Sequence, residues 1–336
     1  MERLEQFKKL IDSPKKMVII THYKPDADAL GSSLALSGYF KVKGHEVTVI
    51  SPSDYPDFLY WMEGNSDVID FEDGNEEICK TLIGEADLIF CVDFNSLKRI
   101  NSLGEMVLNA DAKKVLIDHH LDPERFADFE LWDIKAAASA ELVYQLIVDL
   151  GDRSLINPAL AECLYAGIMT DTGQFKHPNT TKNVHLVTAD LMDLGADVSK
   201  VGALIYDNNS LHRLKFIGFA LSKKLTVLPE YRTAYFAISE KELKRFHFKT
   251  GDTEGLVNYA LSLRNVVLAA VIIERPDVNR ISLRSKGNFS VNDFAREHFD
   301  GGGHSNAAGG TSHENLEETV KKFISILKKY KKELNQ

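Results

Sequence analysis

The chain has 336 residues, of which 44% are hydrophobic and 26% are charged, and its formal net charge at pH 7 is −9. This length suits about two domains with cores of their own, and the balance of apolar and charged residues excludes a disordered chain. The negative charge argues against proteins that wrap long duplex DNA by neutralising its phosphates, but it allows a short anionic substrate in a locally positive site.

The sequence also predicts that the protein is cytoplasmic. Its longest apolar run, residues 266–273, is much shorter than the roughly 18 residues that span a bilayer, so no membrane segment is expected. The first ten residues carry scattered charges and lack the apolar stretch of a secretory signal. The three cysteines, Cys79, Cys91 and Cys163, form no Cys-x-x-Cys pair, which is typical of buried thiols in a reducing compartment.

From residue 17 to about residue 150, short apolar runs alternate with stretches of helical periodicity. This alternation predicts an α/β fold with a mostly parallel sheet flanked by helices. The expected strands are residues 17–21, 46–50, 87–92 and 113–117. The expected helices are residues 29–41, 139–150, 159–169, 181–194 and 211–222. We assign residues 1–222 to an N-terminal domain and its linker region.

The pattern changes after residue 222, where strand-like runs become frequent again. The expected strands are residues 224–228, 233–239, 266–274 and 280–284, with helices between them. The sequence therefore predicts a second, smaller α/β domain over residues 230–336.

Three of the expected strands in the first domain are followed by side chains that can bind metal. His22 follows the first strand, Asp93 the third, and Asp118-His119-His120 the fourth. The carboxyl ends of parallel strands line the ligand crevice of such sheets, so we expect these groups to converge.

Three further carboxylates accompany them. Asp26 and Asp28 precede the helix of residues 29–41, and Asp171 lies where another helix breaks at Gly173. Taken singly, each is explained by an ordinary cap or turn. Taken together with the histidines, they form a donor set of nitrogen and oxygen without thiolate, which suits Mn, Mg, Co or Zn. Two such ions side by side are a common arrangement for hydrolysing phosphate esters.

The second domain contains two segments suited to binding phosphate. Arg284, Ser285 and Lys286 lie at the end of an expected strand, and Gly301-Gly302-Gly303-His304 precedes small residues that we expect to form a helix. Exposed N–H groups before a helix, together with cationic side chains, would hold a substrate phosphate. A glycine-rich turn is also compatible with an ordinary loop.

These motifs resemble those of the DHH phosphoesterase family, which is named for the triplet found here at residues 118–120. The first family motif is matched by His22, Asp26 and Asp28, the second by Asp93 and the fourth by Asp171. Residues 301–304 are similar to the signature of the DHH-associated C-terminal domain. The resemblance implies a DHH domain followed by a smaller substrate-binding domain, with the active site in the cleft between them.

The resemblance also implies a ligand set for two divalent ions, most simply Mn. One ion would bind His22, Asp26 and Asp93, and the other would bind Asp28, Asp93, His119 and Asp171. Asp93 would therefore bridge the two ions. The catalytic residues would be Asp93, His120, which would face the scissile phosphate, and Asp118, which would orient the histidines. Arg99 would contact the substrate phosphate.

The implied reactions are hydrolysis of short single-stranded RNA or DNA oligonucleotides to mononucleotides and of 3′-phosphoadenosine 5′-phosphate (pAp) to AMP. The resemblance also allows a homodimer. One alternative is a phosphodiesterase of the same family that acts on cyclic dinucleotides or on their linear product pApA. Another is a catalytically silent nucleotide-binding module with a regulatory role, because a fold does not guarantee activity.

Overall fold

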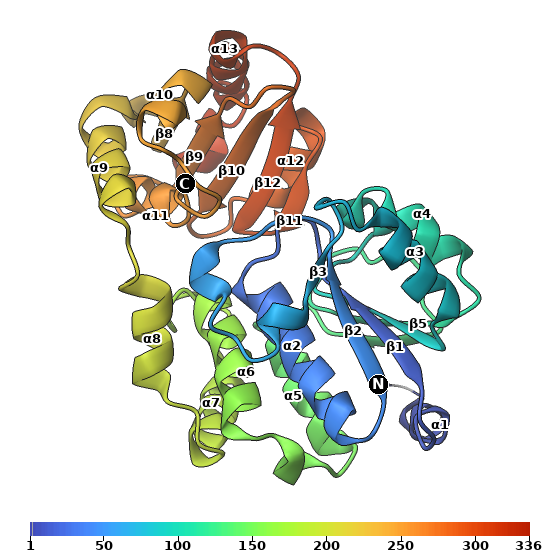
Figure 1. Cartoon of the computed structure of the whole chain (residues 1–336). Helices are drawn as coiled ribbons and strands as arrows, with labels where there is room; N and C mark the ends of the chain where they lie inside the picture. Colours follow the sequence, from blue (N-terminus) through green and yellow to red (C-terminus); the bar gives the residue numbers. More distant parts are fainter. Residues whose placement is uncertain (2) are drawn as a thin grey trace. The chain divides into compact units, whose positions relative to one another are not determined.

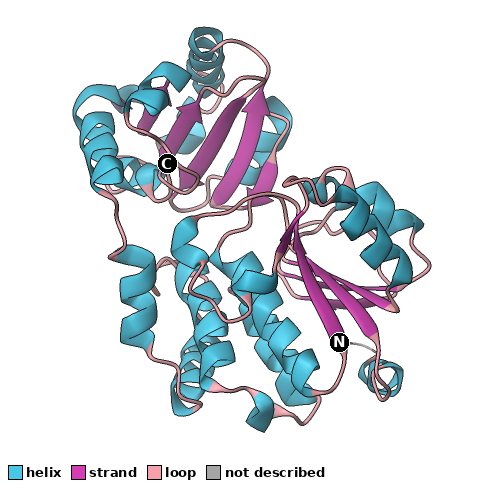
Figure 2. Cartoon of the chain, in the orientation of Figure 1, coloured by secondary structure: helices cyan, strands magenta, loops and turns pink. Residues whose placement is uncertain are grey.

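The structure is a computed structural model that describes Met1 and residues 3–336 (Figure 1). It divides into two compact units, Met1–Asn208 and Asn209–Gln336. Each unit contains one six-stranded sheet, drawn in magenta in Figure 2, with helices packed against it. The expected α/β class, with a parallel sheet in the N-terminal part and a second sheet in the C-terminal part, is confirmed.

The first sheet is parallel throughout, with strand order β3-β2-β1-β4-β5-β6. Its side chains alternate between two apolar clusters: Met17 and Ile19 of β1 face one cluster, and Val18 and Ile20 face the other. Burial on both faces explains why these strands are continuous apolar runs in the sequence. The strands are β1 Lys16–Ile20, β2 Glu46–Ser51, β3 Ile69–Asp70, β4 Leu88–Val92, β5 Lys113–Asp118 and β6 Phe129–Trp132.

Helices cover both faces of this sheet. Figure 1 shows α3 and α4 on one face and α2, α5 and α6 on the other. None of the helices in the described residues combines the length and apolar character needed to cross a membrane. The helices of this unit are α1 Leu4–Leu10, α2 Ala27–Val42, α3 Glu76–Glu85, α4 Leu103–Asn109, α5 Ser139–Asp149, α6 Pro158–Asp171, α7 Lys182–Asp193 and α8 Val198–Tyr206.

The second sheet has strand order β11-β12-β10-β9-β8-β7, and only its β8–β9 pair is parallel. Its strands are β7 Leu225–Leu228, β8 Thr233–Ile238, β9 Leu268–Ile273, β10 Asn279–Ser285, β11 Gly302–His304 and β12 Ala307–Ser312. Its helices are α9 Leu211–Phe219, α10 Glu240–Arg245, α11 Leu256–Leu261, α12 Val291–His298, α13 Leu316–Leu327 and α14 Lys331–Leu334, and a π-helical turn over Ala220–Lys224 follows α9.

The compact units divide earlier in the chain than the boundary we placed at residues 222–230. Helix α9, which we assigned to the first domain, lies in the second unit because Phe216 shares an apolar cluster with Phe236 and Val271. The apolar face of α9 is therefore buried by the second sheet.

The residues after the glycine triplet form a strand, so the helix expected there is wrong. Residues 302–304 and 307–312 form a β-hairpin, in which β12 also pairs with β10. Gly303 has φ +152°, and a Cβ at this residue would lie 2.5 Å from the carbonyl oxygen of Ala307. The glycines therefore allow close strand pairing, and this pairing outweighs the helical preference of the neighbouring alanines.

Candidate metal centre

The side chains expected to converge follow β1, β4 and β5, which are neighbours in the first sheet. Strand order reverses direction between β1 and β4, and ligands of open α/β sheets bind outside the carboxyl ends of the strands at such a point. His22, Asp93, His119 and His120 are all buried there. The topology thus brings residues from three separate parts of the sequence to one place.

His22, Asp26 and Asp93 form a first group of donor atoms. Nε2 of His22 lies 3.5 Å from Oδ2 of Asp93 and 4.0 Å from Oδ2 of Asp26. Nδ1 of His22 is 2.9 Å from the carbonyl oxygen of Tyr23. Because a carbonyl only accepts, the hydrogen of the neutral ring is on Nδ1, and the lone pair of Nε2 points toward the carboxylates. Oδ1 of Asp26 caps α2 by accepting from the N–H groups of Asp28 and Ala29. The same carboxylate therefore caps the helix with one oxygen and faces His22 with the other.

Asp28, His119 and Asp171 form a second group around the other oxygen of Asp93. Nε2 of His119 lies 3.3 Å from Oδ2 of Asp171, 3.4 Å from Oδ1 of Asp93 and 3.7 Å from Oδ2 of Asp28. Nδ1 of His119 lies 3.2 Å from the carbonyl oxygen of Ala136, which fixes the same tautomer as in His22. Such carbonyl contacts are typical of histidines that bind metal.

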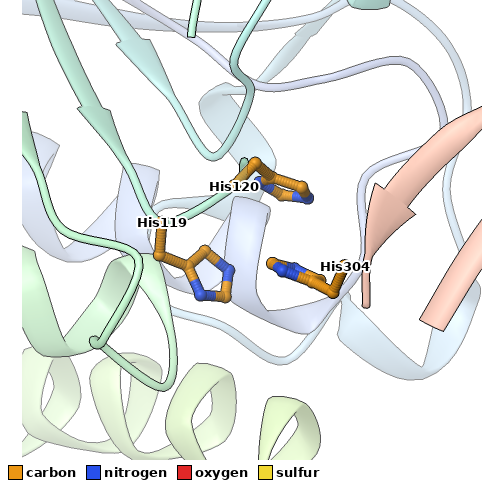
Figure 3. Close-up of side chains that lie close together, drawn as sticks. All are labelled: His119, His120 and His304. Carbon is orange, nitrogen blue, oxygen red and sulfur yellow. The ribbon is translucent and has the colours of Figure 1, made fainter. Parts of the chain in front are cut away.

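His120 has different surroundings from His119. The two imidazoles occupy separate positions after β5, with ring centroids 5.1 Å apart and planes inclined by 73° (Figure 3). Nδ1 of His120 lies 2.7 Å from Oδ1 of Asp118. Asp118 therefore orients His120, whereas His119 is oriented by a main-chain carbonyl. Burial, and after it the positive charge of Arg99, lowers the pKa of His120 well below its ordinary value, so this ring is neutral at pH 7.

The electrostatics of the carboxylates fit bound cations. Burial and then the neighbouring charges of Asp93 and Asp171 raise the pKa of Asp28 well above its usual range, and burial raises the pKa of Asp171 to about 6. Burial would also raise the pKa of Asp93, but the neighbouring imidazoles of His119 and His22 hold it well below its usual range. Crowded buried carboxylates repel one another, and divalent cations would relieve this repulsion.

The spacing of the donor atoms also fits metal ions. Donors that bind one ion at about 2.1 Å lie roughly 3 to 3.6 Å from one another. The distances of 3.3 to 3.7 Å around Nε2 of His119 are close to this range. The residues present are therefore suited to two divalent ions that share Asp93.

The residues of the second unit that we predicted to bind phosphate differ in their surroundings. Arg284 of β10 and His304 of β11 are both paired with Ala307 of β12, which places them on the same face of the sheet. Ser285 is buried, and its hydroxyl donates to the carbonyl oxygen of Phe289 at 2.6 Å. This hydroxyl has a structural role.

The remaining residues of those segments also make internal contacts. Nζ of Lys286 lies 3.3 Å from the carbonyl oxygen of Leu263. The N–H of Gly303, which we predicted to bind phosphate, donates to Oδ1 of Asn292 at 2.9 Å. Gly301 accommodates the close approach of β12, because a Cβ at residue 301 would lie 2.0 Å from the carbonyl oxygen of Gly309. A Cβ at Gly302 would meet side-chain atoms of Arg296 and Asn292 at 3.4 Å.

Sequence reasoning missed Ser139, whose hydroxyl contacts Asp93, and Asn179, whose amide lies 3.3 Å from the carbonyl oxygen of Asp171. Neither residue belongs to a pattern associated with metal binding. Only the folded arrangement brings Ser139 to the Asp93 carboxylate and Asn179 to the main chain of Asp171.

Comparison with known proteins was consistent with this geometry. Residues 16–168 match the DHH family, N-terminal domain, and residues 234–333 match the DHHA1 domain. The chain is 28% identical to a Streptococcus mutans protein named probable bifunctional oligoribonuclease and PAP phosphatase NrnA, over 88% of this chain and 89% of that protein.

Two solved structures extend the comparison. An exopolyphosphatase-related protein from Bacteroides fragilis has a TM-score of 0.93 and 38% identity, covering 99% of this chain and 97% of that chain. Thermus thermophilus RecJ, solved in complex with Mn²⁺, has a TM-score of 0.54 and 14% identity, covering 98% of this chain and 54% of that chain. The RecJ similarity concerns the fold.

Proposed function

Because this chain belongs to the DHH family and carries a DHHA1 domain, we propose that it is a Mn²⁺-dependent phosphoesterase acting on short oligonucleotides and on pAp. Oligonucleotides would be hydrolysed to mononucleotides, and pAp to AMP and phosphate. The name of the S. mutans relative supports these substrates.

The observation that carries this proposal is the position of the Asp93 carboxylate. Its Oδ2 faces His22 at 3.5 Å and its Oδ1 faces His119 at 3.4 Å. A carboxylate with one oxygen toward each of two donor groups is suited to bridging two ions. In the proposed assignment, His22 and Asp26 complete one site, and Asp28, His119 and Asp171 complete the other. When bound, the ions would supply a nucleophile at neutral pH and neutralise charge on the attacked phosphate.

The protein's own residues would orient the reacting groups. We assign His120 to the scissile phosphate, because its Nδ1–H donates to Asp118 and this contact fixes the ring. Burial and the charge of Asp93 raise the pKa of Asp118 to about 6, so at neutral pH this carboxylate is ionised and accepts from His120. Arg99, whose charge acts on both His22 and His120, would contact a phosphate oxygen.

The reaction is a hydrolysis in which water adds to phosphorus. The bond from phosphorus to the departing ribose oxygen breaks, and this oxygen leaves with a proton. Arg284 and His304, on one face of the second sheet, are proposed to bind another part of the substrate. The placement of the active site between two domains stays a prediction.

A substrate panel with purified protein tests the proposal. The panel contains pAp, pApA, RNA of two to five nucleotides, a long single-stranded RNA and tripolyphosphate, each with Mn²⁺ or with EDTA. We expect AMP from pAp and mononucleotides from the short RNAs, little hydrolysis of long RNA, and no reaction in EDTA. Tripolyphosphate is included because the B. fragilis relative is described as exopolyphosphatase-related.

Each alternative predicts a different result. Binding of pAp without any hydrolysis would indicate a silent nucleotide-binding module. Hydrolysis of pApA alone would indicate a phosphodiesterase for products of cyclic dinucleotides. Hydrolysis of tripolyphosphate alone, or undiminished activity in EDTA, would contradict the proposed function.

A further inference from the structure

The segment that leads from β6 into α5 contacts the candidate metal centre through its main chain. The N–H groups of Ser139 and Ala140 donate to Oδ2 and Oδ1 of Asp28, at 2.6 and 2.9 Å. The carbonyl oxygen of Ala136 lies 3.2 Å from Nδ1 of His119. The beginning of α5 therefore fixes two of the proposed ligands without using a side chain.

One side chain of this segment adds a further contact. The hydroxyl of Ser139 donates to Oδ1 of Asp93 at 2.8 Å, and both residues are buried. Within the described residues this hydroxyl makes no hydrogen bond with the main chain of α5, whose first N–H groups donate to Asp28 instead. The contact with the carboxylate is its only hydrogen bond among those found in the described residues.

The Ser139 hydroxyl contacts Asp93, whose carboxylate faces both His22 and His119. Oδ1 of Asp93, held by Ser139, is the oxygen on the His119 side, and fixing it directs Oδ2 toward His22. Asp93 also has φ +66°, a left-handed backbone conformation that is uncommon outside glycine. Such a conformation persists only where the surrounding structure holds the residue.

We propose that Ser139 is a positioning residue of the metal centre, whose hydroxyl fixes the Asp93 carboxylate in the orientation that binds two ions. The inference rests on the proposed function and names a residue outside the ligand set. Hydrogen-bond partners of metal ligands typically change metal affinity 10- to 100-fold when they are removed.

Mn²⁺ titration of the metal-free protein by calorimetry tests this role without measuring activity. We expect Ser139→Ala to weaken Mn²⁺ binding roughly 10- to 100-fold. Urea unfolding in EDTA measures separately the stability that is lost with a buried hydrogen bond to a carboxylate. Ser33→Ala is the matched control. The Ser33 hydroxyl is buried in α2 and has no hydrogen-bond partner among the described residues, so its removal should leave Mn²⁺ affinity unchanged.

Two more variants keep the test informative if Ser139→Ala fails to fold. Ser139→Cys keeps the side-chain size but offers a weak donor, and it should weaken Mn²⁺ binding. Ser139→Thr keeps the hydroxyl and should restore most of the affinity. Wild-type affinity in both Ser139→Ala and Ser139→Cys would overturn the positioning role and leave the proposed function intact. A wild-type protein that binds no Mn²⁺ would overturn the metal centre itself, and with it this inference.

Discussion

At the scale of single residues, adjacent histidines in the Asp118-His119-His120 triplet have different partners. Nδ1 of His119 contacts a main-chain carbonyl, and its Nε2 faces three carboxylates. Nδ1 of His120 contacts Asp118 instead. A histidine whose Nε2 faces carboxylates is suited to binding a cation with them, whereas a neutral ring held by one carboxylate is suited to contacting substrate.

This difference predicts that replacing each histidine with asparagine will affect Mn²⁺ binding differently. His120→Asn should keep Mn²⁺ bound but lower turnover of a dinucleotide roughly 10²- to 10⁴-fold, the usual contribution of one acid–base or charge-stabilising group. His119→Asn should lose Mn²⁺ as well as turnover. Bound Mn²⁺ is counted after gel filtration, and turnover is measured with excess Mn²⁺. Equal loss of metal in both variants, or recovery of His120→Asn with added Mn²⁺, would reject the division of roles.

At the scale of secondary-structure elements, helices α2 and α6 approach closely beside Asp28. A Cβ at Gly167 of α6 would lie 2.6 Å from Oδ1 of Asp28 and 2.9 Å from Cβ of Ala140. Asp28 is fully buried, so it has little room to move away. The absence of a side chain at residue 167 therefore makes space for a proposed metal ligand.

Gly167→Ala should lower the free energy of unfolding by about 1 to 3 kcal/mol, as overpacking of a core does. It should also weaken Mn²⁺ binding, because the added methyl group displaces the Asp28 carboxylate. Gly202→Ala in α8 is the control: a Cβ there meets no atom within 4 Å, so it should stabilise the helix by about 0.5 to 1 kcal/mol. Urea unfolding in EDTA and calorimetry with Mn²⁺ measure the two effects. A stabilised Gly167→Ala with normal Mn²⁺ affinity would contradict this account.

A hydrogen bond between α2 and the residues after α5 predicts a pH effect on stability. The hydroxyl of Tyr39 donates to Oδ2 of Asp152 at 2.7 Å, and Lys43 contacts the same oxygen at 2.9 Å. Burial would raise the pKa of Asp152, but these two hydrogen bonds lower it below its ordinary value. Their stabilisation is therefore present above the unfolded-state pKa of about 3.9 and is lost as the pH falls through the lower native-state pKa.

Tyr39→Phe should accordingly lower the free energy of unfolding by about 1.5 to 3 kcal/mol at pH 7, since the acceptor is charged. The difference from wild type should shrink in urea unfolding as the pH falls below the unfolded-state pKa of about 3.9 and native Asp152 becomes protonated. Tyr55→Phe provides the comparison, because the Tyr55 hydroxyl donates to the uncharged amide oxygen of Asn65 at 3.0 Å. Its effect should not depend on pH, and equal pH dependence in the two variants would refute the assignment to Asp152.

Strands with a continuous apolar run could be predicted from the sequence. Strands that depend on pairing with a distant part of the chain could not. The buried strands β1, β4 and β5 are continuous apolar runs, and the expected bounds differ from the observed ones by one residue at most. Strand β3 has only two residues, and the β11–β12 hairpin is built from glycine, alanine and other small residues. Such segments have little periodicity of their own, so their strand pairing depends on contacts that are distant in sequence.

The same distinction applies to the candidate metal centre. Polar residues that directly follow buried strands, such as His22 and Asp93, are visible in the sequence because the apolar run stops there. The contacts of Ser139 with Asp28 and Asp93 join residues 111 and 46 positions apart. No local pattern marks Ser139. No local pattern shows either that the hydroxyl of Ser285, which we predicted to bind substrate, donates to the carbonyl oxygen of Phe289.

At the scale of the whole molecule, the two units have separate sheets and separate apolar clusters. The carboxylates and imidazoles of the proposed ligand set all belong to the first unit, whereas Arg284 and His304 belong to the second. Metal binding and the proposed contribution of the second unit to substrate binding are therefore separable by substitution.

Arg284→Ala and His304→Ala should raise the KM for pAp and short RNA and leave Mn²⁺ affinity unchanged. A lost charge-assisted hydrogen bond to phosphate costs about 1.5 to 3 kcal/mol, which corresponds to roughly 10- to 100-fold in kcat/KM. Lys321→Ala is the control for charge, because Lys321 in α13 of the second unit pairs with Glu317 and Glu318, and its loss should leave KM unchanged. Steady-state kinetics and Mn²⁺ calorimetry on the same preparations provide the comparison. Loss of Mn²⁺ from either variant with an unchanged KM would show that the second unit does not bind substrate through these residues.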